Sequence, residues 1–260
     1  MHNFHNRIFG VFFLLVSLQS ASCGNKLPEE ITGETPSKEI VNLGDAAFSK
    51  GYYTRAGEYY LELNRFHPYS SLDGKALYKA VDAFYRAEKY EKTRFAASKF
   101  LLDYSNTPEA EQVIYTNAWS YCREILNVDR DQGAAKNCIA SLKSFLSLYP
   151  SSKNKKNANT QIKYAQEFLV GQELTIGKYY LKKKNPSAAI RRLKGIQKTV
   201  KSSKFFPETG YRLMEAYLMM GLIDNALSEE KRMKKMFPDS SWTSEGSKLM
   251  AQFRPTKIAD

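Results

Sequence analysis

Histidine is scarce in this sequence of 260 residues, which holds only His2, His5 and His67. The first two lie in a segment that we expect to be removed, so a single histidine remains. That count excludes zinc sites built from several histidines and two-histidine iron sites. A Ser-His-acid triad would have to use His67, which lies in an expected turn rather than in the buried, oriented position that such a base requires.

Motifs of nucleotide and cofactor chemistry are missing as well. The sequence has no Gly-rich phosphate loop, no Cys-x-x-Cys and no His-Glu-x-x-His. The acids of Asp129-Arg130-Asp131 supply too few oxygens for calcium, and we interpret this segment as a helix-capping, salt-bridged loop. We therefore expect a protein that is not an enzyme and that holds no cofactor and no metal.

The one sustained apolar run covers residues 8–16. Nine residues at 1.5 Å each cannot cross a hydrocarbon layer of ~30 Å. Arg7 precedes the run, and small and polar residues follow it as far as Cys23, so residues 1–22 are interpreted as a signal peptide.

Ser20-Ala21-Ser22 before Cys23 resembles a bacterial lipobox, in which the cysteine receives a diacylglycerol. Ser20 stands where leucine is usual, so ordinary signal-peptidase cleavage after Ser22 stays open. The residue after the cysteine is Gly24 and not Asp, which resembles the pattern of lipoproteins that are sorted to the outer membrane. We expect lipidation at Cys23, a flexible tether over 23–37, and a protein anchored to the outer membrane and facing the periplasm.

Positive charge is concentrated in one part of the chain. The sequence carries a net charge of +12, and residues 151–235 hold 19 Lys and Arg against 7 acids. In an exported protein, this favours an acidic protein surface as the partner over nucleic acid.

Apolar residues recur at helical spacing from Lys38 onward, in segments separated by Gly, Pro, Asn and Asp. They match the 34-residue tetratricopeptide pattern in the first unit, and the pattern returns near the other end. The first unit carries Ile40, Leu43, Gly44, Ala47, Gly51, Tyr53, Ala56, Tyr60, Leu63 and Pro68 at the pattern positions. We predict an all-α, right-handed α-solenoid of about five tetratricopeptide helix pairs, without a sheet.

Cys122 and Cys138 lie on consecutive expected helices of the middle unit. A disulfide is compatible with export. We favour small buried thiols, because Cys138 takes a position at which the repeat needs a small apolar side chain.

The concave face of tetratricopeptide repeats is lined by four positions of each first helix. In the first two units a cation, a bulky apolar residue, an acid and an aromatic recur there in the same order. These residues are Lys38, Val41, Asp45, Phe48 and Lys75, Tyr78, Asp82, Tyr85. Such a ladder suits an extended peptide; the alternative is that it only records internal duplication.

Several local motifs together resemble the BamD family, the lipoprotein subunits of the outer-membrane β-barrel assembly machine. They are Arg65-Phe66-His67-Pro68-Tyr69-Ser70, Val128-Asp129-Arg130-Asp131, Phe145-Leu146-x-Leu148-Tyr149-Pro150-x-Ser152, Ile176-Gly177-x-Tyr179-Tyr180-x-x-Lys183, and Ala188-Ala189-Ile190-Arg191-Arg192. The likeness covers residues 38–235 and departs from the family at the lipobox, in a shortened segment before Asp129, and in the tail to residue 260.

The resemblance implies a non-enzymatic scaffold that binds the periplasmic domains of the barrel-forming subunit BamA and unfolded β-barrel substrates. It also implies a subunit contact at Arg192, and we expect Arg191 and Lys194 to share it. Further lipoproteins of the machine are left open as partners. The expected divisions are 38–110 with the peptide groove, 111–240 with the subunit contact, and a tail over 241–260. The alternative is a generic periplasmic repeat lipoprotein that coordinates cell-envelope or cell-division proteins.

Overall fold

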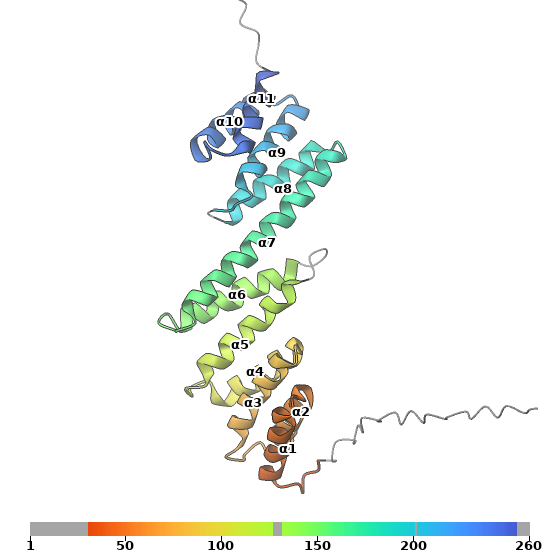
Figure 1. The fold of residues 1–260 in the computed structure, drawn as a ribbon, viewed down its shortest axis with the longest axis vertical. Helices are drawn as coiled ribbons and strands as arrows, with labels where there is room; N and C mark the ends of the chain where they lie inside the picture. Colours follow the sequence, from red (N-terminus) through yellow and green to blue (C-terminus); the bar gives the residue numbers. More distant parts are fainter. Residues whose placement is uncertain (1–30, 127–131, 201, 254–260) are drawn as a thin grey trace, which may run out of the picture.

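The computed structural model describes residues 31–126, 132–200 and 202–253, and the regular secondary structure of this part of the chain is helical. Its helices are α1 Ser37–Ser49, α2 Tyr53–Phe66, α3 Asp73–Arg86, α4 Tyr90–Tyr104, α5 Ala110–Arg123, η1 Glu124–Leu126, α6 Gln132–Leu148, α7 Lys155–Lys182, α8 Pro186–Thr199, α9 Phe206–Met219, α10 Ile223–Met236 and α11 Ser241–Ala251. They stack into an elongated solenoid (Figure 1). The prediction of an all-α solenoid is confirmed.

Consecutive helices pack in pairs, as a tetratricopeptide array requires. The pairs are α1 with α2, α3 with α4, α5 with α6, α7 with α8, and α9 with α10. Small residues let the two helices of a pair approach each other. A Cβ on Gly177 of α7 would lie 2.6 Å from Leu193 Cδ2 of α8, and a Cβ on Gly44 would overlap the Tyr60 ring in the same way. These two positions therefore require glycine for packing.

Helix α7 has 28 residues, about twice the length of the helical segments that we expect between Gly, Pro, Asn and Asp in the sequence. No proline interrupts it, so the helix continues through two units. Its buried stripe first runs through Ala158, Ile162, Ala165 and Leu169, and then through Val170, Leu174 and Gly177. The step from Leu169 to Val170 moves the stripe by one residue, which rotates it by about 100° around the helix.

That rotation divides the buried residues of α7 between two hydrophobic cores. Leu169 belongs to the middle core with α5 and α6, whereas Val170 belongs to the C-terminal core with α8 to α11. A third core joins α1 to α5. Helix α7 is therefore the element that connects the middle of the solenoid with its C-terminal end (Figure 1).

Both ends of the predicted repeat region differ from the sequence expectation. Ile31 packs against the first core, and His67 Nε2 donates a hydrogen bond to the Thr35 carbonyl at 2.8 Å, so residues 31–36 belong to the folded unit and not to the tether. At the other end, the first part of the predicted tail forms α11. The Ser240 side chain caps this helix by accepting a hydrogen bond from the Trp242 amide, and the Trp242 ring packs on Tyr211 of α9.

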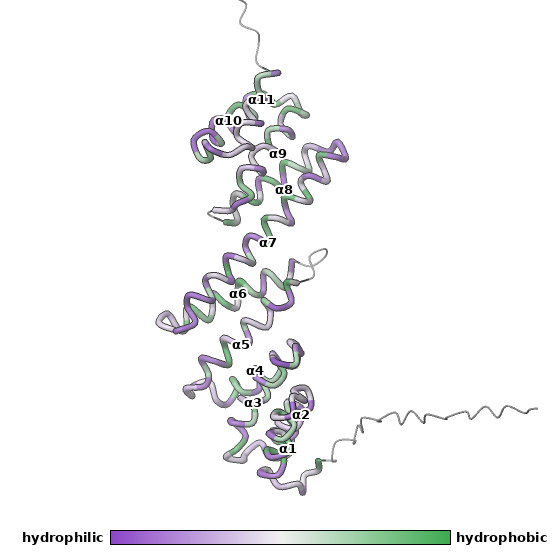
Figure 2. Tube along the Cα trace, in the orientation of Figure 1, coloured by the Kyte–Doolittle hydropathy of each residue, from purple (hydrophilic) through white to green (hydrophobic). Residues whose placement is uncertain are grey.

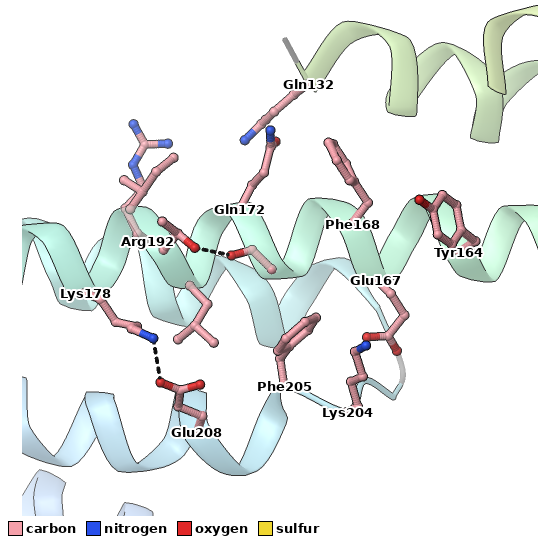
Figure 3. A pocket seen from close by; sticks show the side chains of 14 residues that line it. Gln132, Tyr164, Glu167, Phe168, Gln172, Lys178, Arg192, Lys204, Phe205 and Glu208 are labelled. Atoms are coloured by element: carbon pink, nitrogen blue, oxygen red, sulfur yellow. Dashed lines mark hydrogen bonds and ion pairs between the residues drawn. The ribbon is translucent and has the colours of Figure 1, made fainter. Parts of the chain in front are cut away.

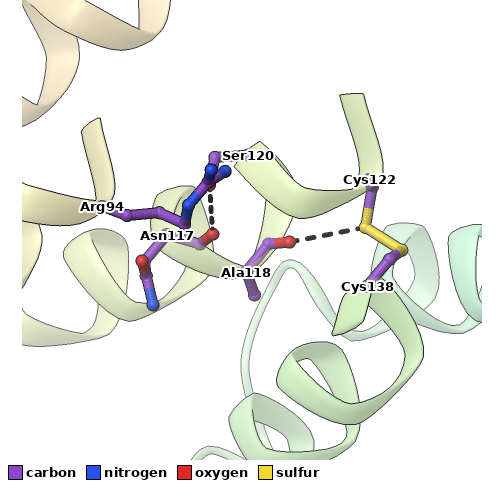
Figure 4. The surroundings of a disulfide bond; sticks show 6 residues. All are labelled: Arg94, Asn117, Ala118, Ser120, Cys122 and Cys138. Carbon is purple, nitrogen blue, oxygen red and sulfur yellow. Dashed lines mark hydrogen bonds between the residues drawn. A yellow bond between two sulfur atoms is a disulfide. The ribbon is translucent and has the colours of Figure 1, made fainter. Parts of the chain in front are cut away.

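Cys122 and Cys138 form a disulfide between α5 and α6 (Figure 4). Our preference for two free thiols is therefore wrong. The small position of Cys138 brings the two helices so close that the Cα atoms lie 4.7 Å apart, within the range that a disulfide needs.

Polar and apolar residues alternate along the helices (Figure 2). Among the described residues, no helix combines the length and the hydropathy that a membrane span requires. The predicted signal peptide, Cys23 and the Asp129-Arg130-Asp131 loop lie outside the described residues.

Candidate interaction surfaces

A pocket of about 800 Å³ opens beside the middle of α7, where the buried stripe changes direction (Figure 3). Its apolar wall consists of Tyr164 and Phe168 of α7 and Phe205 of the α8–α9 connection. The Phe205 ring lies against Gly171, which leaves room for it on the helix surface. The Nζ atom of Lys178 lies 2.9 Å from Glu208 Oε1 at one end of the pocket. The pocket thus combines an aromatic wall with a charged rim.

Glu173 of α7 connects three helices next to this pocket. Its Oε1 atom accepts a hydrogen bond of 2.7 Å from Gln132 Nε2 at the start of α6. Arg192 Nη1 of α8 lies 3.5 Å from both carboxylate oxygens. Arg192 Nε is buried and has no hydrogen-bond partner among the described residues. Its guanidinium is thus held at the junction with part of its hydrogen-bonding capacity unused.

The three predicted partner-binding residues do not share one surface. Arg191 and Arg192 line a second hollow of about 520 Å³ that also includes Gln132 and Lys136. Lys194 points elsewhere, with its Nζ atom 5.5 Å from the centre of the Tyr217 ring on α9. Arg191 is exposed, and the Arg192 side chain is 41% exposed. The structure therefore brings Arg191 and Arg192 together and separates Lys194 from them.

Most acids of the basic region, residues 151–235, are paired within the chain. Glu215 binds Arg212, Glu229 binds Arg232, and Glu230 binds Lys234. Many of the cations are exposed at the surface; they include Lys153, Lys155, Lys156, Lys163, Lys182, Lys183, Lys184, Arg191, Lys231 and Lys235. The exposed charge of this region is therefore strongly positive, which suits an acidic partner surface.

In the N-terminal units, Lys38 and Lys75 of the predicted groove are exposed. Asp45 is already engaged, since it accepts hydrogen bonds from Lys79 Nζ at 2.6 and 2.8 Å and from the Tyr60 hydroxyl. Partial burial acts to raise the pKa of Asp45, but the hydrogen bonds from Lys79 and Tyr60 and the positive charge of Lys79 outweigh it and lower the pKa below its ordinary value. Asp45 is therefore a link between α1 and α3.

The remaining ladder residues are also partly used within the solenoid. Asp82 pairs with Arg86 at 2.9 Å. Phe48 and Tyr78 are half-buried and pack against the first core, and the Tyr85 ring lies 6.0 Å from that of Tyr90. Phe48 and Tyr78 therefore contribute to the packing of the first core as well as to the ladder. Lys38, Lys75 and Asp45 are the exposed residues of the ladder, and Asp45 is already paired with Lys79.

Arginine clamps that the sequence analysis missed join neighbouring units. The Cζ atom of Arg86 on α3 lies 5.3 Å from the centre of the Phe48 ring and 6.0 Å from the centre of the Tyr53 ring. Arg123 of α5 donates to the Tyr90 hydroxyl at 3.4 Å. Arg86 and Arg123 are spaced by the same 37 residues as the first two units, and this spacing could have revealed them.

The described residues contain no group of three or more His, Cys, Asp or Glu side chains that could hold a metal ion. Stacked helix pairs with an aromatic pocket, a basic surface and a set of inter-unit clamps define a tetratricopeptide-type scaffold, a class that is typically non-enzymatic. Residues 33–233 match the family model YfiO, described as "Outer membrane lipoprotein". The chain belongs to this family.

Two curated relatives are named "Outer membrane protein assembly factor BamD". The protein of Caulobacter vibrioides is 29% identical over 239 residues, which cover 91% of this chain and 78% of that protein. The protein of Rickettsia prowazekii is 26% identical over 219 residues, which cover 84% of this chain and 87% of that protein. The resemblance to BamD seen in the sequence is confirmed, and the family places the chain at the outer membrane.

Among solved structures, the chain is similar to the MamA protein, with a TM-score of 0.34 and 14% identity over 86% of this chain and 98% of that one. It is also similar to the TPR2AB domain of yeast Sti1 in a complex titled with pHSP90, with a TM-score of 0.39 and 12% identity over 84% of this chain and 85% of that one.

Proposed function

We propose that this protein is an outer membrane protein assembly factor, a lipid-anchored scaffold that binds the barrel-forming subunit BamA and unfolded β-barrel substrates. The observation that supports this most is the family match over residues 33–233, which covers ten of the eleven described α-helices almost completely. Relatives that match 91% and 84% of this chain carry the name of the assembly factor.

The subunit contact is proposed at the junction of α6, α7 and α8. Arg191 is exposed, and Arg192 is held beside Glu173 with its Nε atom unpaired among the described residues. An acidic side chain of BamA that reaches the exposed part of this guanidinium would add charge-assisted hydrogen bonds to it. The surrounding basic surface would steer the acidic partner and fix its register.

The aromatic pocket next to the junction offers the apolar part of the same contact. Interface energy concentrates in a few buried aromatic and arginine anchors. Arg192 lines both the pocket with Tyr164, Phe168 and Phe205 and the hollow that Arg191 lines. Lys194 would contribute at most a peripheral charge.

Substrate contact is proposed on the N-terminal units. Lys38 and Lys75 occupy equivalent places on α1 and α3 and are exposed. They can hold carbonyl or carboxylate groups of an extended chain. The aromatic residues of the ladder then shape the surface from which these lysines project.

Titration of the purified protein with the periplasmic domains of BamA tests the subunit contact. We expect saturable binding that weakens with added salt, because an acidic partner meets a basic surface. The Arg191→Glu variant should bind much more weakly, and the control Lys50→Glu, an equal charge change on the exposed α1–α2 turn, should bind normally. Equal loss in both variants would mean that only net charge matters, and no binding at all would favour the generic repeat lipoprotein.

The lipid anchor is proposed at Cys23. Wild-type protein should enter the detergent phase after phase separation, whereas Cys23→Ala should stay in the aqueous phase with unchanged helical content. An unmodified N-terminus by mass spectrometry in the wild-type protein would show that the signal peptide is removed by ordinary cleavage.

A further inference from the structure

The start of the folded chain is fixed beside the C-terminal end of α2. Ile31 packs against the first core. His67 Nε2, directly after α2, donates a hydrogen bond to the Thr35 carbonyl at 2.8 Å. A Cβ on Gly33 would lie 3.7 Å from Phe66 Cδ1, so this segment lies against the end of the helix. The tether therefore leaves the solenoid at the α2–α3 turn.

Tyr69 projects from this turn with 99% of its surface exposed. Single exposed aromatics are common on soluble proteins, and Tyr69 is distinguished by its place beside the tether exit. It follows His67 by two residues, so its Cα lies within about 7 Å of the residue that fixes the tether exit. A tyrosine ring with a polar hydroxyl suits the boundary between lipid and water.

The tether is short once residues 31–36 belong to the fold. Seven residues lie between Cys23 and Ile31, and the eight Cα–Cα steps from Cys23 to Ile31 reach at most about 29 Å at full extension. Helix α2 has 14 residues and is about 21 Å long, so the α1–α2 turn lies that much farther from the exit. Lipid attached to Cys23 would thus keep the α2–α3 turn within reach of the membrane.

We propose that the α2–α3 turn rests on the lipid surface, with the Tyr69 ring in the headgroup region. This inference rests on the proposed lipid anchor at Cys23. It adds a second, protein-based contact that fixes the tilt of the solenoid relative to the membrane, which the lipid chains alone would leave free.

Charge does not drive this contact. Cations near this end, Lys38, Arg65, Lys75 and Lys99 among them, are offset by nearby acids that include Glu34, Glu39, Glu62 and Asp103. Arg65 already pairs with Glu62. The contact should therefore form on uncharged phosphatidylcholine as well as on anionic vesicles, and it should resist added salt.

The test uses the mature, acylated protein, purified from membranes and reconstituted into phosphatidylethanolamine–phosphatidylglycerol vesicles. Tyr69→Trp places an indole on the turn. Tyr52→Trp is the matched control, because Tyr52 is 58% exposed on the α1–α2 turn at the other end of the same helix pair. The native Trp119 and Trp242 contribute the same background to both variants, and circular dichroism checks that both are folded.

We expect the emission of Tyr69→Trp to shift to shorter wavelength on reconstitution and to be quenched by lipids with brominated chains. The emission of Tyr52→Trp should change little. Inserting about ten Gly and Ser residues after Asn25 should reduce the quenching of Tyr69→Trp, since a longer tether frees the turn from the surface.

Two failures can be told apart. If the protein does not float with vesicles, the lipid anchor is wrong and the inference falls with it. If it floats but the two variants are quenched equally, or Tyr69→Trp keeps the emission of a fully hydrated indole, the turn does not touch lipid and the anchor alone stands.

Discussion

Arg192 of α8 lies against Glu173 of α7, with its Nη1 atom 3.5 Å from both carboxylate oxygens. Gln132 of α6 donates to the same carboxylate, so one acid on the long helix holds the helices on either side of it. The subunit contact that we propose is thus built on a joint within the solenoid rather than on an isolated surface arginine.

Reversing the charge at Arg192 should affect both the fold and the contact. Arg192→Glu would face Glu173, and we expect a loss of about 1 kcal/mol in the free energy of unfolding, because the pair is partly exposed to solvent. Chemical denaturation measures this loss, and binding of BamA periplasmic domains should fall as well.

Arg191→Glu separates these two effects. Arg191 is exposed, so its reversal should change the free energy of unfolding by no more than about 0.5 kcal/mol. Weakened binding with retained stability would locate the contact here. If both variants bind BamA normally, the hollow beside α8 is a solvated surface and the subunit contact lies elsewhere.

The Cys122–Cys138 disulfide should stabilise the middle unit. It closes a separation of 16 residues in the sequence, and both cysteines are buried. Replacing both with Ala should lower the free energy of unfolding by about 2–4 kcal/mol. Mass spectrometry after alkylation under denaturing conditions should find neither cysteine modified unless a reductant is added. Alkylation of both without reductant would contradict the bond.

The exposed lysines of the N-terminal groove should govern substrate capture. Lys38→Ala with Lys75→Ala should weaken binding of an unfolded β-barrel protein without lowering the melting temperature, because neither side chain is buried. The control pair Lys50→Ala and Lys89→Ala removes the same charge from exposed turn positions. Unchanged capture by the first pair would mean that the ladder only records duplication.

The pair of Asp45 on α1 and Lys79 on α3 should make the stability of the protein depend on pH. The pKa of Asp45 is lowered in the folded protein, so its contribution to stability is present above the ordinary value of 3.8 and is lost as the pH falls through the lower folded pKa. Lys79→Gln should therefore destabilise the protein by up to about 1 kcal/mol at pH 6 and by less at pH 3. Denaturation curves of both proteins at the two pH values measure this, and an equal difference at both would contradict the pairing.

Much of the fold follows from the sequence because the repeat positions carry it. Gly44 and Gly177 mark close helix contacts, and Pro68 marks the end of a unit. The length of α7 could not be predicted from the sequence. Its buried residues have ordinary helical spacing both before Leu169 and after Val170, so the spacing does not show that one helix serves two units. Only the packing shows that the two halves face different cores.

The candidate sites were less predictable because side-chain pairing is a tertiary property. Arg192 was found through its motif, but its partner Glu173 and the link to Gln132 depend on how α6, α7 and α8 meet. Asp45 looked available from its position in the repeat, yet Lys79 lies 34 residues away and occupies it. The disulfide was not predicted because Cys138 was interpreted as a small apolar residue that only allows close helix packing. The same close packing brings Cys122 within bonding distance.

The most direct test of the assembly function is affinity purification of this protein from detergent-solubilised outer membranes of its own cells, followed by protein identification. Our account predicts that BamA is recovered with the wild-type protein and is largely lost with Arg191→Glu, while the variant itself stays folded and in the membrane fraction. Recovery of cell-division or peptidoglycan-linked proteins without BamA would contradict the account and support the generic repeat lipoprotein.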